Sequence, residues 1–283
     1  MPGCIHTSEL AQEGKLQVTN GYYLEFGEFT RILNYLRQYP ERKRFGREEI
    51  SVATGLPKRH VQSLASITAS MNLTTTQTYR LTELGRLIAE NDTFFDDLGT
   101  LWLCHYLLAS NMENIVWNHM ANCVLPSGVR VTSSDARKTM LPFLLGFSKR
   151  TTGKKLLQEI RSFFNAYAKQ RFRDLHYLRE GSGAYYLRYS STPVPPLTLM
   201  CTLITYRDRF SPGASGLEIG PVCSADNSPG RLLNLREAQV RELLDQLHRT
   251  DLLTIEARAD LDQVRFGQEL TVTEVLSRYY RER

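Results

Sequence analysis

Hydrophobic residues recur three and four positions apart near the start of the chain. This spacing is typical of a helix that packs one face against a core. The stretch FGEFTRILNYLRQYP (residues 26–40) therefore predicts an amphipathic helix that ends before Pro40. The positions expected to face inward are Phe26, Phe29, Ile32, Leu33 and Leu36.

Two more helical patterns follow, separated by a tight turn. The stretch GREEISVATG (residues 46–55) predicts a short helix with Ile50 and Ala53 inward, stopped by its closing glycine. The stretch PKRHVQSLASITASMNL (residues 57–73) predicts the next helix, which opens on a proline whose missing N–H costs nothing in a first turn. Its inward positions are Val61, Leu64, Ile67 and Met71.

A threonine-rich segment comes next. LTTTQTYRLTELG (residues 73–85) has an alternating pattern that predicts a short β-hairpin. Thr82 is placed to cap a further helix, ELGRLIAEN (residues 83–91). A helix, a helix-turn-helix and a β-wing in this order are typical of a winged helix-turn-helix, which we expect over residues 22–92.

The remaining chain gives a coarser pattern. Residues 93–192 are expected to form a helical middle, with helices at 135–145 and 154–179 and a linker or loop at 181–196. Residues 193–283 combine an amphipathic helix, one or two strands and a closing helix, which predicts a small α+β module that resembles a second winged unit. The predicted class is mainly α, with residues 1–21 as a mobile N-terminal segment.

Composition narrows the compartment and the partner. The longest apolar stretch is about 12 residues, short of the roughly 20 that a membrane span needs. The five cysteines are scattered, which indicates a reduced compartment without a disulfide framework or zinc site, so we expect a cytoplasmic protein of prokaryotic or viral style. The net charge of +5 favours a polyanionic partner only mildly. Basic residues concentrate at 42–47, 149–155, 169–173 and 278–283.

The helix that opens on Pro57 carries the candidate DNA-binding chemistry. If it is a recognition helix, its exposed face holds cationic and amide side chains that can bond to guanine or adenine edges. The wing would supply phosphate or minor-groove contacts. The predicted contact residues are Lys58, Arg59, His60, Gln62, Ser63, Ser66, Gln77 and Arg80. Winged helices also serve as protein-interaction modules, so this alternative stays open.

Other reactive residues favour structural roles. Cys104 and His105 are adjacent on a helix and point in different directions, which favours core packing over a nucleophilic pair. Asp96 and Asp97 precede an apolar run, where acidic residues cap a helix. His119 lies four residues before a cysteine, but this metal half-site has no second half.

Two glycine-containing stretches fall short of phosphate-binding motifs. In KRTTGKK, Lys155 stands where a P-loop requires Ser or Thr, so at most a basic patch is expected. GASGLEIG (residues 213–220) lacks the dinucleotide-binding spacing and is predicted to be a loop. No catalytic residue, cofactor or metal is therefore predicted, and the protein is expected to be non-enzymatic.

Several motifs together carry a family resemblance. They are LTELG (residues 81–85), the acidic pair at 96–97, TLWLCHYLLASN (100–111), NSPGRLLNL (227–235) and RYY (278–280). With these the chain resembles a bacterial domain family of unknown function found in phage-defence islands, beside the sulfur-transfer enzymes of DNA phosphorothioation. The resemblance implies a setting in DNA modification or defence, and the family offers no assigned catalytic residues to transfer to this chain.

The combined expectation is a non-enzymatic component or regulator of such a system that binds double-stranded DNA. The alternative is an adaptor subunit that assembles with a sulfur-transfer or nuclease partner. Neither the DNA site nor the oligomeric state follows from the sequence.

Overall fold

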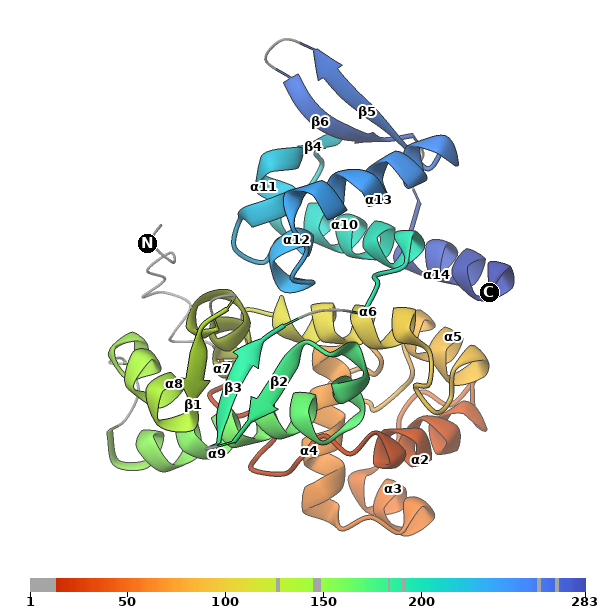
Figure 1. Ribbon diagram of the computed structural model, residues 1–283. Coiled ribbons are helices and arrows are strands. Elements are labelled where there is room, and N and C mark those ends of the chain that lie inside the picture. The colour runs from red at the N-terminus through yellow and green to blue at the C-terminus, as the bar shows by residue number, and fades with distance from the viewer. Residues whose placement is uncertain are drawn as a thin grey trace. The chain divides into compact units, whose positions relative to one another are not determined.

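The computed structural model describes residues 14–125, 128–144, 149–182, 184–189, 192–258, 261–267 and 270–283 (Figure 1). The chain divides into two compact units, residues 1–192 and residues 193–283. Within the described residues the protein is mainly helical, and each unit has a three-stranded antiparallel sheet. The mainly α class is thus confirmed, with more strand in the middle of the chain than expected.

The first helices match the hydrophobic pattern. They are α2 (Phe26–Arg37), α3 (Arg47–Thr54), α4 (Lys58–Ser70) and α5 (Glu83–Asn91). All the predicted inward positions of α2 and α4 are buried, including Phe29, Leu64 and Met71. Ala53 on α3 is exposed, so the inward prediction is wrong there and holds only for Ile50.

Local signals set the ends of these helices. Gly55 stops α3 with φ of 69°, a left-handed conformation that glycine adopts without a Cβ clash. The Thr82 hydroxyl accepts a hydrogen bond of 2.9 Å from the backbone N–H of Gly85 and caps α5 as predicted. The hairpin expected between α4 and α5 is reduced to one isolated bridge, Thr74 to Leu81. Three threonines in this segment bond locally instead of supporting a ladder.

The helix α6 (Leu98–Ala109) is buried on nearly every side, which explains why its sequence is apolar all round rather than striped. The Asp97 carboxylate accepts the backbone N–H of Thr100 at 2.8 Å, so the predicted cap is confirmed. Short helical turns follow α6, namely α7 (Ile115–His119) and a π-turn at Met120–Val124.

The middle of the first unit contains a sheet that the helical pattern did not predict. The strands β1 (Arg130–Thr132), β2 (Leu178–Gly181) and β3 (Tyr185–Arg188) pair in the order β1-β3-β2. The helix expected at 154–179 is found as α9 (Lys149–Ala168), but its predicted end is wrong, because residues 178–179 lie in β2. The expected linker at 181–196 contains β3. Two adjacent tyrosines start β3, a residue type enriched in strands. The helix α8 (Ser133–Met140) follows β1 and packs on α9.

The chain before α2 is anchored, at least from residue 14 onward. Val18 and Thr19 are wholly buried, and both donate to the carboxylate of Glu159 on α9. A mobile segment over 1–21 is therefore wrong for residues 14–21, while residues 1–13 lie outside the described part. A buried acceptor with several donors holds this segment in place.

The second unit is α+β, as expected. Its sheet has the order β4-β6-β5, and the one or two strands expected before the closing helix are β5 and β6, which pair antiparallel. GASGLEIG is not only loop, because β4 begins at Gly216. The elements of this unit are α10 (Pro196–Phe210), β4 (Gly216–Glu218), α11 (Ile219–Ser224), α12 (Pro229–Leu232), α13 (Glu237–Arg249), β5 (Leu253–Arg258), β6 (Leu261–Phe266) and α14 (Val272–Glu282).

Further findings concern membrane-spanning helices and the cysteines. Across the residues that the structure describes, no helix is both long and apolar enough to cross a membrane. Cys104, Cys201 and Cys223 are free thiols, and burial raises the pKa of each. Cys123 is disulfide-bonded, so the reduced pattern expected for the scattered cysteines does not hold at this residue.

Candidate nucleic-acid interface

The N-terminal turn of α4 presents part of the predicted contact face. Lys58, Arg59 and Gln62 are all exposed. Lys58 forms a salt bridge with Glu48 of α3, and the Gln62 side chain accepts a 3.0 Å hydrogen bond from Arg47 of α3. Arg59 forms no salt bridge with any residue that the structure describes. These three side chains are therefore available to a ligand, two of them only by exchanging a surface contact.

The rest of the predicted α4 face is less available. Ser63 is wholly buried, and its hydroxyl donates a 2.5 Å hydrogen bond to the carbonyl of Thr19. His60 stacks beside Tyr22 with ring centroids 4.2 Å apart, and its Nδ1 lies 3.2 Å from Glu28. Ser66 is half-buried. The expectation that Ser63 is exposed is wrong, because the chain before α2 covers this side of α4.

The loop between α2 and α3 contributes a second basic segment. Lys43 and Arg44 are exposed, and neither forms a salt bridge within the described part of the chain. The backbone N–H of Phe45 donates a 3.0 Å hydrogen bond to the carbonyl of Thr78, so this loop is tied to the segment where the wing was predicted. Gln77 beside that contact is exposed. The basic loop is thereby joined to a polar segment far from it in sequence.

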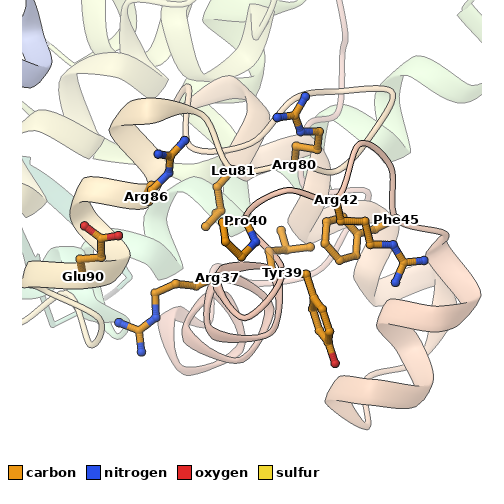
Figure 2. Close-up of a pocket in the computed structure, with 10 residues that line it drawn as sticks. Arg37, Tyr39, Pro40, Arg42, Phe45, Arg80, Leu81, Arg86 and Glu90 are labelled. Atoms are coloured by element: carbon orange, nitrogen blue, oxygen red, sulfur yellow. The ribbon is translucent and has the colours of Figure 1, made fainter.

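A small pocket opens between this loop, the end of α2, the segment before α5 and α5 itself. Its cavity volume is about 100 Å³. Figure 2 shows Pro40 and Leu81 in the middle, with arginines placed around them. The lining residues are Leu36, Arg37, Tyr39, Pro40, Arg42, Phe45, Arg80, Leu81, Arg86 and Glu90.

The four arginines of this pocket differ in their partners. Arg42 binds both oxygens of Glu49, at 2.5 and 2.7 Å, and lies over the Phe45 ring. A hydrogen bond from Tyr35 and the charge of Arg42 hold the pKa of Glu49 below its ordinary value, so this carboxylate stays ionised.

Among the described residues, the other three arginines have no carboxylate partner of this kind. Arg37 donates one hydrogen bond of 2.8 Å to the carbonyl of Ala89. Arg80 and Arg86 form no salt bridge within the part of the chain that is described, and both are exposed. Sequence reasoning found Arg80 but missed Arg37 and Arg86. A signal was present, since both are cations on the exposed faces of amphipathic helices, but it does not show which faces converge.

Reactive residues elsewhere take structural positions. His105 is fully buried, and its Nδ1 lies 2.5 Å from the Tyr167 hydroxyl within an aromatic cluster, so packing is confirmed for it and for Cys104. Asp96 pairs with Arg171. Lys154 lies within α9 and not in a phosphate loop. Among the residues that the structure describes, no group of three or more His, Cys, Asp or Glu side chains is placed to hold a metal ion.

Comparison with known proteins assigns a family to this fold. The model of the family described as protein of unknown function (DUF4007) matches residues 24–280, so the chain belongs to that family. No curated protein matches the chain in sequence.

Two solved structures are similar in fold. One is a magnesium ion-bound SspB crystal structure, with a TM-score of 0.80 and 16% identity over 97% of this chain and 90% of that one. The other is an SspB crystal structure, with a TM-score of 0.77 and 17% identity over 97% and 91%. Identity this low supports a shared fold and nothing about ligands.

Proposed function

We propose that the protein is a non-enzymatic subunit that binds double-stranded DNA through its first unit. The observation that carries the proposal is the joining of separate basic segments around the first turn of α3. Arg42 reaches Glu49, Lys58 reaches Glu48, and Arg47 bonds to Gln62. Together with the wing contact of Phe45, these bonds bring residues 42–44, 58–62 and 77–80 to one region.

The helix order supports a winged-helix mode of binding. In such modules the second helix of the helix-turn-helix enters the major groove with its N-terminal residues at the base edges. Here that helix is α4, so Lys58, Arg59 and Gln62 would lie against the bases. Gln77, Arg80, Lys43 and Arg44 would contact the backbone. Ser63 and His60 are excluded from the contact set by their packing.

The cellular setting is proposed from the family resemblance. Motifs of this chain resemble those of a family placed in phage-defence islands beside DNA phosphorothioation enzymes. We infer that the protein works in the cytoplasm of a prokaryote, in a defence or DNA-modification system of this kind. An enzyme of the same system would be its second partner.

Fluorescence anisotropy on random-sequence duplex DNA tests the proposal. Wild type should bind in a salt-dependent manner, and log K should fall with log salt at a slope of about −0.9 per phosphate contact. The triple variant Lys58→Ala, Arg59→Ala, Gln62→Ala should lose about tenfold or more in affinity at low salt. Arg161→Ala, an exposed arginine on α9, is the matched control and should bind as wild type does.

An adaptor is the competing function, and one observation favours it. Val52 on α3 is 81% exposed, next to polar surface that a protein partner could also use. If duplex binding is absent, or survives the triple variant unchanged, the α4 face is not a DNA reader. Capture of a sulfur-transfer or nuclease subunit that Val52→Asp abolishes would then establish the adaptor role.

A further inference from the structure

The pocket of Figure 2 has the composition of an anion site. Its lining includes the apolar side chains of Leu36, Pro40 and Leu81. Four of its lining residues are arginines and one, Glu90, is acidic. Apolar walls weaken the competition of water for a bound ion, so guanidinium groups at such a site bind an anion more strongly than on open surface.

Two of these arginines have no salt-bridge partner among the described residues. Arg42 forms a salt bridge with Glu49, and one Nη of Arg37 donates a hydrogen bond to the carbonyl of Ala89 near the end of α5. Arg80 and Arg86 have no salt bridge to any residue that the structure describes. They approach the pocket from different elements, Arg80 from the segment before α5 and Arg86 from α5 itself.

The size of the pocket limits the ligand. Sites for drug-sized molecules measure roughly 300–1,000 Å³. A cavity of about 100 Å³ is too small to enclose a nucleoside. A single phosphate group is small, and guanidinium forks match its oxygens in a bidentate manner.

The surroundings favour a phosphate that belongs to a nucleic acid. The pocket shares Arg42 and Phe45 with the basic loop 42–45 and shares Arg80 with the wing segment. The loop leads into α3 and is bonded to the wing segment through Phe45 and Thr78, and α3 in turn contacts the first turn of α4. A duplex that lies across these segments would present its backbone to the pocket.

We propose that this pocket binds one backbone phosphate of duplex DNA, held jointly by Arg80 and Arg86 with Arg37 at its edge. The inference rests on the proposed function and adds to it the location of one phosphate contact and the number of arginines that share that phosphate. It fixes the register of the backbone rather than the base sequence, since phosphate contacts position a protein on DNA without reading it.

The salt dependence of duplex binding tests the stoichiometry. The single variants Arg80→Gln and Arg86→Gln and the double variant are compared by anisotropy on random-sequence duplex over several salt concentrations. Two arginines on one phosphate should make the double variant shallower in slope by about 0.9, whereas two phosphates would give about 1.8. Arg161→Gln is the control and should leave the slope unchanged.

A further variant tests the site by a change that should raise duplex affinity. Glu90 is the one acidic side chain in the lining, and it is exposed on α5. Glu90→Gln should therefore raise duplex affinity severalfold, while Glu113→Gln, which removes the same charge elsewhere in the unit, should not. Thermal melts followed by circular dichroism should show all variants folded, because these side chains are exposed.

The outcomes separate the two proposals. A slope unchanged in the double variant, with wild type still binding DNA, overturns the pocket and leaves the proposed function. No duplex binding by wild type overturns both. Titration of inorganic phosphate into the full chain distinguishes the source of the phosphate. Tight binding that the double variant loses would reassign the pocket to a free anion.

Discussion

At the scale of single residues, Glu159 is a fully buried acidic residue of the first unit whose side chain accepts several hydrogen bonds. Its carboxylate is buried in α9 and accepts hydrogen bonds from the backbone N–H groups of Val18 and Thr19, the Thr19 hydroxyl and the Trp117 indole N–H. Four donors meet one acceptor group that water does not reach. The residue therefore links the segment before α2 to α7 and α9.

We expect Glu159→Ala to lower the free energy of unfolding by about 3 kcal/mol or more, because several buried donors lose their acceptor. Glu159→Gln keeps one carbonyl oxygen and should cost about 1 kcal/mol. Urea denaturation followed by tryptophan fluorescence measures both. Equal losses in the two variants would show that side-chain volume, and not hydrogen bonding, matters at this position.

The same residue predicts a dependence of stability on pH. Burial raises the pKa of Glu159 above its ordinary value of 4.5, and the four hydrogen bonds only partly oppose this. A raised folded-state pKa contributes stability that is full below the unfolded value and is lost as pH rises through the folded value. The stability of wild type relative to Glu159→Gln should thus fall from pH 4 toward pH 7. A flat difference would contradict this sign.

At the scale of elements, the first turn of α5 packs closely against the backbone of Leu73 through Gly85. A Cβ at Gly85 would lie 1.9 Å from the carbonyl oxygen of Leu73. That carbonyl also accepts a 3.0 Å hydrogen bond from the N–H of Thr82, so it has little freedom to move. The glycine in LTELG is explained by this close approach.

Gly85→Ala should therefore displace α5 and lower stability by about 2 kcal/mol or more. Gly27 offers the matched control, since it lies in α2 and a Cβ added there would meet no atom within 4 Å. Gly27→Ala should be neutral or stabilise by about 0.5 kcal/mol through helix propensity. Thermal unfolding of the two variants gives the comparison. Similar melting temperatures for Gly85→Ala and Gly27→Ala would show that the Leu73 backbone can move to make room for the added Cβ.

Periodicity predicted these helices because each buries one face, and the predicted signals set the end of α3 at Gly55 and the start of α5 at Thr82. It failed where structure depends on distant partners. The strand β3 pairs with β1, more than 50 residues earlier, and no local pattern shows that pairing. Ser63 has the spacing of an exposed position, yet the segment around Thr19 covers it.

The candidate site divides in the same way. Lys58, Arg59 and Arg80 could be named from the sequence, because they lie in the helix-turn-helix and wing that the pattern predicts. Arg37 and Arg86 could not, because they join the pocket only when α2 and α5 pack together. Side chains that converge from separate helices leave no mark in any short window of sequence.

At the scale of the whole molecule, a net charge of +5 is too small to bind DNA by diffuse attraction alone. Exposed charges act over about 8 Å at physiological salt. The double variant Lys43→Ala, Arg44→Ala in the first unit should therefore lower duplex affinity about tenfold. Arg249→Ala, Arg281→Ala in the second unit removes the same charge and should change affinity less than twofold. Anisotropy at about 0.15 M salt makes the comparison, and equal losses would mean that both units contact DNA.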